Sequence, residues 1–169
     1  KVMHGVIDRA QAIGEQIGSP GPPARSPAYS PDGSMIATIN VAANSVDLWN
    51  STNSVEIGVL AGHTDTITSL SYSRDGKYIL TSSGDHTARI WQARAPSQLL
   101  ELKGQSTEVS SAAFDGEGLR VVTASKSDGK IQVWDARSAR IIRTISSAYV
   151  KSAEFSPSGS HILTSSDNA

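Results

Sequence analysis

The chain has 169 residues, which suits one ordinary domain, and its 15 basic and 16 acidic side chains leave a formal net charge of −1. No block of like charge favours nucleic acid or an anionic membrane as a partner, and no apolar run approaches the roughly 18 residues of a membrane-spanning helix. The absence of cysteine excludes disulfides, thiolate catalysis and zinc sites built on cysteine.

In chain order, the sequence is a series of short β-type runs separated by turns rich in Gly, Ser, Asp and Pro, and this pattern predicts an all-β fold. Residues 6–18, "VIDRAQAIGEQIG", are similar to residues 133–145, "VWDARSARIIRTI", if one deletion is allowed, and Ile7 then takes the register of Trp134. The Pro-rich residues 19–27, "SPGPPARSP", lead into the turn "SPDG" and the β-type run "SMIATI".

Two markers recur along the rest of the chain at nearly constant intervals. The tryptophans Trp49, Trp91 and Trp134 are 42 and 43 residues apart. Turn dipeptides that follow an aromatic residue and precede a β-type run are spaced by 43, 42 and 41 residues, at Asp32-Gly33, Asp75-Gly76, Glu117-Gly118 and Ser158-Gly159. A period of roughly 40–45 residues with four strands in each repeat is typical of propeller blades.

The phased motifs also include "GH" at Gly62-His63, "WD" at Trp134-Asp135, "WN" at Trp49-Asn50 and "WQ" at Trp91-Gln92. With them, the sequence resembles the WD-repeat β-propeller family over nearly its whole length. The resemblance implies an all-β propeller of four-stranded antiparallel blades, with three full blades and a half-blade at each end. The implied divisions of this one propeller domain are residues 1–18 (strands c and d), 19–61 (blade 1), 62–103 (blade 2), 104–146 (blade 3) and 147–169 (strands a and b).

The second repeat shows the expected strands most clearly. Strand a is expected over residues 67–73, strand b over 78–83, strand c over 88–91 and strand d over 99–103. In the family, strand a lies innermost at the central channel and strand d lies at the outer edge. Because the blades pack face to face, their strands are covered on both faces and need not alternate strictly between apolar and polar residues.

The resemblance also implies a buried hydrogen-bond network in each blade. In the second repeat the matching residues are His63 in the d–a loop, Thr81 on strand b, Asp85 in the b–c turn and Trp91 on strand c. Their chemistry suits a chain of bonds, because the indole N–H only donates, the hydroxyl both donates and accepts, and the carboxylate accepts. We therefore interpret His63 and Asp85 as structural and not catalytic.

The other two full repeats depart from this pattern. The third keeps Thr123, Asp128 and Trp134 but has "GQ" at Gly104-Gln105 where the family has "GH". The first keeps Thr38 and Trp49 but lacks the histidine and has Ala43 in the aspartate register. We expect a complete network in the second repeat alone, with the others held mainly by apolar packing.

The two half-blades expected at the ends are complementary, and an exposed strand edge is a template for pairing. Three arrangements follow from this. The chain is a fragment of a longer propeller, or two chains pair end to end as a homodimer that closes an eight-bladed ring, or one chain closes its own four-bladed ring.

No catalytic, metal or cofactor motif stands out. The sequence has no GxSxG elbow, no HExxH pair and no Gly-rich phosphate loop, and His4, His86 and His161 are scattered over loop and strand-end registers. We therefore expect no enzymatic activity and no cofactor, and we expect a cytoplasmic protein. A hydrolase or lyase of propeller type is the alternative that convergent acids or histidines at the channel would have favoured.

The family resemblance implies a partner-binding rim formed by the residues just before the apolar start of each strand a. These registers hold Pro23, Thr66, Glu108 and Tyr149, and the charged residues Arg25, Asp65 and Lys151 lie beside them in the sequence. An exposed tyrosine is a good interface anchor. The sequence thus predicts a non-catalytic scaffold that binds a protein or peptide at this rim, and a sensor or autoinhibitory segment of a larger signalling protein is a further alternative.

Overall fold

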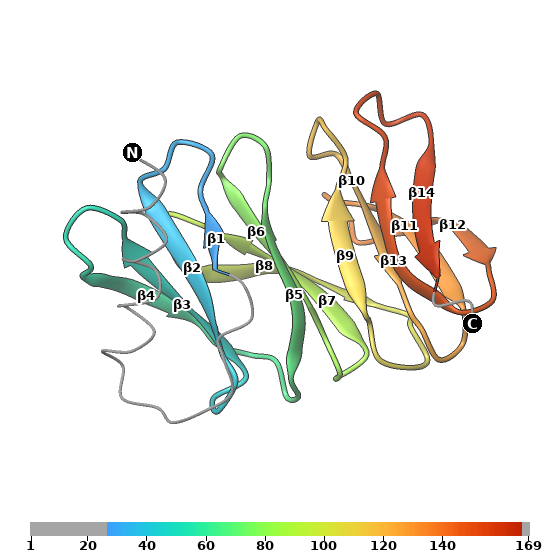
Figure 1. Ribbon diagram of the computed structural model, residues 1–169, viewed down its shortest axis with the longest axis horizontal. Coiled ribbons are helices and arrows are strands. Elements are labelled where there is room, and N and C mark those ends of the chain that lie inside the picture. Colours follow the sequence, from blue (N-terminus) through green and yellow to red (C-terminus); the bar gives the residue numbers. More distant parts are fainter. Residues whose placement is uncertain (1–26, 167–169) are drawn as a thin grey trace.

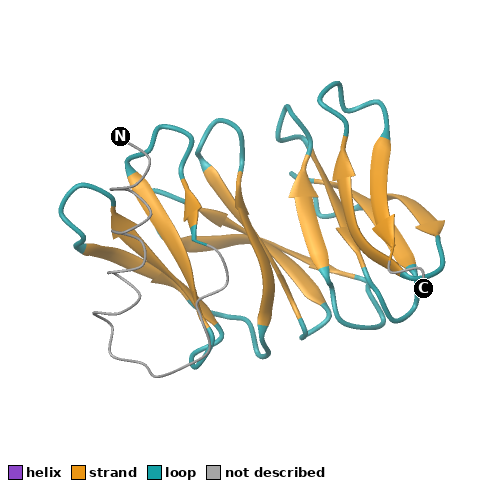
Figure 2. Cartoon of the chain, in the orientation of Figure 1, coloured by secondary structure: helices purple, strands orange, loops and turns teal. Residues whose placement is uncertain are grey.

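The computed structural model describes residues 27–166, and this part of the chain is built of strands and loops without a helix (Figure 2). Fourteen strands form three four-stranded sheets and one two-stranded sheet, which follow one another in chain order along the long axis of the molecule (Figure 1). The prediction of an all-β fold of four-stranded antiparallel blades is confirmed. The half-blade predicted for residues 1–18 lies outside the described residues.

Each sheet is an antiparallel meander in which neighbours in sequence are neighbours in space. The first sheet, blade 1, contains β1 (Ala28–Tyr29), β2 (Met35–Asn40), β3 (Ser45–Asn50) and β4 (Glu56–Leu60). Blade 2 contains β5 (Ile67–Tyr72), β6 (Tyr78–Ser83), β7 (Thr87–Gln92) and β8 (Ser97–Lys103). Blade 3 contains β9 (Ser111–Phe114), β10 (Arg120–Ala124), β11 (Lys130–Asp135) and β12 (Ile141–Ser146), and the half-blade contains β13 (Val150–Phe155) and β14 (Ile162–Ser166).

The core lies between successive blades, because adjacent residues of a strand point to opposite faces of its sheet. On β6, Ile79 packs toward blade 1, whereas the next residue, Leu80, packs toward blade 3. On β10, Val121 faces blade 2 and Val122 faces the half-blade. Each of these four side chains is 0 % exposed, so the second strands β6 and β10 bury apolar residues on both of their faces.

Hydroxyl side chains at the innermost strands tie blade 2 to blade 3, and blade 3 to the last sheet, with the same two bonds. Thr68 Oγ1 donates to the carbonyl of Val109 at 2.5 Å, and one blade later Ser110 Oγ donates to the carbonyl of Lys151 at 2.9 Å. In the next register, Ser69 Oγ accepts the amide of Ala112 and Ser111 Oγ accepts the amide of Ala153, both at 3.2 Å. The inner strands β5, β9 and β13 are therefore successive neighbours, which places strand a innermost.

The a–b turns follow the chemistry that the sequence indicates. Ser30 Oγ donates to Asp32 at 2.6 Å and Ser73 Oγ donates to Asp75 at 2.7 Å, so the aspartate stabilises its own turn. The glycine that follows has a φ of 70° at both Gly33 and Gly76, a left-handed conformation that favours glycine. Part of the repeat signal is thus a requirement of the turn itself.

The strand bounds in blade 2 are close to those predicted. Strand a ends one residue earlier than expected, and strand b has the predicted bounds. Strand c begins one residue earlier and ends one residue later than expected, and strand d begins two residues earlier. The described residues contain no helix that is long and apolar enough to cross a membrane.

Candidate functional site: the blade network and the channel rim

Blade 2 contains a chain of hydrogen bonds that links four of its segments. Trp91 Nε1 on β7 donates to Thr81 Oγ1 on β6 at 2.9 Å, and Thr81 Oγ1 lies 2.7 Å from His63 Nε2 in the loop before β5. His63 Nδ1 lies 2.8 Å from Asp85 Oδ2 in the turn between β6 and β7. The other carboxylate oxygen, Asp85 Oδ1, accepts the hydroxyl of Thr87 at 2.6 Å.

The protonation of this chain follows from burial and partners. Burial lowers the pKa of His63, and the adjoining carboxylate of Asp85 opposes this effect without overcoming it, so the imidazole is neutral near pH 7. Although burial alone would raise it, the hydrogen bonds from Thr87 and His63 lower the pKa of Asp85 to about 2. Since Asp85 only accepts, Nδ1 of His63 carries the proton and Nε2 accepts the hydroxyl of Thr81.

The geometry leaves this set little freedom to react with a substrate. The side chains of His63 and Asp85 are 0 % and 5 % exposed, and Asp85 also accepts the backbone amide of Thr64 at 3.1 Å. Every polar side-chain atom of the chain from Trp91 to Asp85 therefore has a partner within the blade. Such an arrangement fixes the positions of one loop, two strands and one turn relative to one another.

Blade 3 has a related arrangement that is divided into two parts. Gln105 is buried in the position of His63, and its Nε2 donates to Thr123 Oγ1 at 2.8 Å, while Trp134 Nε1 donates to the same oxygen at 2.9 Å. Gln105 Oε1 has no hydrogen-bond partner among the described residues. Asp128 accepts instead from Ser106 Oγ at 2.5 Å, and its Oδ2 lies 3.2 Å from Lys130 Nζ.

In blade 1 only the bond between strands b and c remains, from Trp49 Nε1 to Thr38 Oγ1 at 2.9 Å. A carboxylate that sequence reasoning missed is buried beside it: Asp47 on β3 accepts from Asn40 Nδ2 at 3.1 Å. No repeated motif marks Asp47, because its register carries Arg89 in blade 2 and Gln132 in blade 3.

The predicted rim residues lie where the loops before the inner strands end. Thr66, Glu108 and Tyr149 each precede the first core residue of strand a, and those core residues, Ile67, Val109 and Val150, are at most 1 % exposed. Glu108, Asp65 and Lys151 are exposed and Thr66 is half-buried. Pro23 and Arg25 lie outside the described residues.

Tyr149 differs from the other described rim residues in its backbone. Its side chain is 66 % exposed and its φ is 59°, a conformation that is uncommon for a bulky residue. The loop that carries it joins β12 to β13 across three residues, whereas the loop from β4 to β5 has six, which include Gly62 and His63. The short loop forces the chain to turn sharply at Tyr149.

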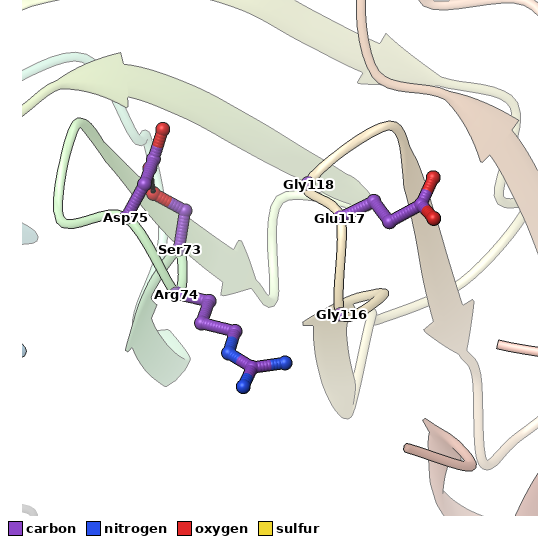
Figure 3. Close-up of a pocket in the computed structure, with 6 residues that line it drawn as sticks. All are labelled: Ser73, Arg74, Asp75, Gly116, Glu117 and Gly118. Atoms are coloured by element: carbon purple, nitrogen blue, oxygen red, sulfur yellow. Dashed lines mark hydrogen bonds between the residues drawn. The ribbon is translucent and has the colours of Figure 1, made fainter. Parts of the chain in front are cut away.

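A shallow hollow that the sequence does not reveal lies at the opposite end of the inner strands, between the a–b turns of blades 2 and 3. Figure 3 shows the Arg74 side chain extending toward the turn at Gly116, while Glu117 points away from it. A Cβ atom added to Gly116 would lie 3.9 Å from Arg74 Nη1. The hollow is lined by Ser73, Arg74, Asp75, Gly116, Glu117 and Gly118.

Residues 27–166 contain no group of three or more His, Cys, Asp or Glu side chains that could hold a metal ion. The titratable groups of the blade 2 network and of the rim positions are instead distributed over the blades. His63 and Asp85 belong to the network of blade 2, whereas Asp65, Glu108 and Lys151 belong to the rim positions of three successive sheets.

The sequence is similar to several curated proteins. It is 32 % identical over 111 residues to eukaryotic translation initiation factor 3 subunit I of Eremothecium gossypii, a match that covers 65 % of this chain and 32 % of that protein. It is 31 % identical over 122 residues to the pre-mRNA-splicing factor cwf17 of Schizosaccharomyces pombe, which covers 72 % of this chain and 36 % of that protein. The chain thus spans about a third of the length of these relatives.

A family model described as WD domain, G-beta repeat matches residues 54–92, 96–135 and 139–169, which together are more than half of the chain. Each match begins near an outer strand and continues into the next sheet, so a repeat of this family joins strand d of one blade to strands a, b and c of the following blade. The motifs, the four-stranded sheets and this match agree. The chain is a member of the WD-repeat family.

Proposed function

We propose that this chain is a non-catalytic scaffold whose channel-facing rim binds a protein or a peptide. The rim positions lie at the starts of three successive inner strands that the core and the hydroxyl bonds hold together, and they are Asp65, Thr66, Glu108, Tyr149 and Lys151. Family membership supports the proposal, as do relatives that are named as a subunit of an initiation factor and as a splicing factor. Arg25 belongs to the same expected set.

The observation that carries the proposal is the exposed, strained Tyr149. A non-glycine residue in the left-handed region costs on the order of 1–3 kcal/mol and persists only where the surroundings impose it. Tyrosine is enriched among the residues that dominate binding energy, because it offers a large apolar ring and a polar end. A loop that presents such a ring with 66 % of its surface exposed suits an interface anchor.

The charged residues around Tyr149 indicate which chemistry a bound peptide would have. Lys151 follows it on β13, and Glu108 occupies the corresponding position one blade earlier. A peptide that places an apolar side chain on the tyrosine ring between charges of both signs would complement this surface. The near-neutral net charge of the chain gives no support to nucleic acid or a membrane surface as the partner.

We further propose that the network of His63, Thr81, Asp85 and Trp91 acts as a structural brace, with Thr123, Asp128 and Trp134 in blade 3 and Trp49 in blade 1 as partial versions. Two of its side chains could serve hydrolysis, but His63 and Asp85 are buried and bonded to blade residues. No observation in the described residues favours the hydrolase or lyase alternative. A cytoplasmic location and a sensor role within a larger protein stay predictions.

The test of the rim is a selection of binders from a phage-displayed random peptide library on the 169-residue chain, followed by affinity measurements. We expect the selected peptides to lose at least about tenfold in affinity with Tyr149→Asn, because asparagine tolerates the left-handed backbone but lacks the ring. The matched control is Leu99→Asn on the outer strand β8, where the leucine is 45 % exposed.

The two variants separate the possible results. Loss of affinity with Tyr149→Asn alone supports the rim as the binding surface. Equal binding by Tyr149→Asn and the wild-type chain, with loss on the outer strand, would overturn the proposal and move the site to the edge of the blades.

A further inference from the structure

The hollow between the a–b turns of blades 2 and 3 lies between two complete blades, at the end of the inner strands that is opposite the rim. Its volume is about 200 Å³, whereas one water molecule in the liquid takes roughly 30 Å³. The hollow can therefore hold a group larger than a single water molecule. The other junctions between successive sheets bring the same two turns together, so they show how the corresponding space is used elsewhere in the protein.

The junction between blades 1 and 2 is filled at this end. A Cβ atom added to Gly76 would lie 3.3 Å from Cδ of Pro31, so the proline ring of one turn packs on the turn of the next blade. Beside it, Arg94 Nη2 donates to Asp32 Oδ2 at 2.9 Å. This salt bridge joins the c–d turn of blade 2 to the a–b turn of blade 1 and closes the junction.

The junction between blade 3 and the last sheet is filled in a different way. Arg120 Nη2 donates to the carbonyl of Gly159 at 2.8 Å, and its guanidinium lies 4.9 Å from the centroid of the Phe155 ring. Between blades 2 and 3, a Cβ atom added to Gly118 would meet no described residue within 4 Å, apart from its neighbours in the chain. Gly118 has the register of Gly76 and Gly159, so the space that is occupied in the other two junctions is open here.

Two arginines at this junction lack the contacts that their registers have between blades 1 and 2. Arg74 has the register of Pro31, and it extends toward the hollow without a hydrogen bond or salt bridge to the described residues (Figure 3). Arg137 has the register of Arg94, and its guanidinium forms no hydrogen bond or salt bridge within residues 27–166. Because Arg94 reaches the a–b turn of the preceding blade, Arg137 has the length and the register to reach the edge of the hollow.

The carboxylates at the hollow do not bind these arginines. Asp75 Oδ1 accepts the hydroxyl of Ser73 at 2.7 Å, and Asp75 Oδ2 lies 3.2 Å from Lys77 Nζ, so this charge is balanced within its own turn. Glu117 points away from the hollow (Figure 3). The junction thus combines an open space with two guanidinium groups that have no bound carboxylate, and this combination favours an anionic ligand.

We propose that this hollow binds a phosphate group, held by Arg74 from blade 2 and Arg137 from blade 3. A guanidinium bonds phosphate through two parallel N–H donors. Phosphate offers oxygens in several directions, so two arginines from two turns can each bond a different pair, whereas a carboxylate has two oxygens in one plane. Inorganic phosphate and a phosphorylated side chain share this chemistry. The inference does not depend on the proposed rim, which lies at the other end of the inner strands.

The test is a titration of the ¹⁵N-labelled 169-residue chain with sodium phosphate at low ionic strength, followed by the NMR shifts of its amides, with sodium chloride as the reference titration. We expect saturable shifts at Gly116 and Gly118, which line the hollow, and none at Gly33 in blade 1. The expected dissociation constant is on the order of 1 mM, because the site is open to solvent and its charges are screened.

Three variants assign the binding to the two arginines. Arg74→Pro should weaken phosphate binding at least about tenfold, because it removes one guanidinium from the hollow. Proline suits this turn, since Pro31 and Pro157 have the same register. Arg137→Gln should weaken binding at least about threefold. The matched control is Arg94→Gln, which removes the same charge one junction earlier and should change the affinity by less than about twofold.

A peptide that contains phosphoserine distinguishes the two sources of the phosphate group. Tighter binding of this peptide than of inorganic phosphate supports the site and assigns it to a phosphorylated partner, and equal binding supports it as a site for the free anion. The proposal is wrong if phosphate causes no saturable shift, or if Arg74→Pro binds as the wild-type chain does. It is also wrong if Arg94→Gln loses as much affinity as Arg74→Pro, or if acetate binds as tightly as phosphate.

Discussion

The role of the blade networks as structural braces can be measured by replacing the central threonine of each blade with valine. Valine keeps the shape of threonine and removes the hydroxyl. In blade 2, Thr81→Val leaves the indole N–H of Trp91 and Nε2 of His63 without partners in a position that is 0 % exposed. A buried polar group without a partner costs about 1–3 kcal/mol, so we expect a loss of about 4 kcal/mol in the free energy of unfolding.

The same substitution in the other blades gives a graded series. Thr123→Val leaves Trp134 and Gln105 without their acceptor, and the expected loss is about 3 kcal/mol because Gln105 already has one unpaired atom in the native protein. Thr38→Val removes the bond from Trp49 and a long bond of 3.5 Å to the carbonyl of Asp47, from a half-buried position, and the expected loss is about 1 kcal/mol.

The assay is urea unfolding followed by tryptophan fluorescence, with the free energy extrapolated to water. The order of the three losses is the decisive quantity, since all three variants make the same chemical change in the same register. If Thr38→Val destabilises the protein as much as Thr81→Val, then the histidine and aspartate add nothing to the bond between threonine and tryptophan, and the reasoning about the brace is wrong.

Three further predictions concern two residues of the blade networks and one residue of the rim. Burial holds the pKa of His63 below its unfolded value of 6.5, so the unfolded chain binds more protons below that pH. The free energy of unfolding should therefore decrease as the pH falls from about 6.5. The variant His63→Gln should flatten this dependence in urea titrations between pH 8 and 5. Gln105→His should raise the free energy of unfolding by about 1 kcal/mol, measured in the same way, because an imidazole can bond to both Thr123 and the carboxylate of Asp128. Tyr149→Gly should raise the melting temperature slightly, with a gain of about 1 kcal/mol, because glycine adopts a φ of 59° without strain; a lower melting temperature would show that the ring is packed.

Much of the fold can be predicted from the sequence, because the patterns that indicate it involve residues close together in the chain. The turn glycines and aspartates fix where each hairpin bends, and the apolar runs between them have the length of a strand covered on both faces. Thr81 and Thr123, which accept from Trp91 and Trp134, stand 10 and 11 residues before the tryptophan of their repeats, so the repeat pattern also indicates these pairs. Strand b of blade 2 has the predicted bounds because the signals that mark it are also local.

Other features depend on neighbours that no local pattern specifies. Gln105 takes the position of a histidine, but only the packing around it shows that its amide reaches Thr123 and that Asp128 is bound by Ser106 instead. The buried pair of Asp47 and Asn40 has no repeated motif, and the strain at Tyr149 arises because the loop before β13 is shorter than its counterparts.

The sequence by itself determined the repeat, the strands and the family, because period, turn chemistry and tryptophan phase are properties of consecutive residues. Only the tertiary structure decided which face each side chain covers and what meets it there. Leu163 and Leu80 have the same residue type and register, yet one is 73 % exposed and the other 0 %. The difference arises because burial depends on the next strand and the next blade, which lie in space beside β6 and are absent beside β14 in the described residues.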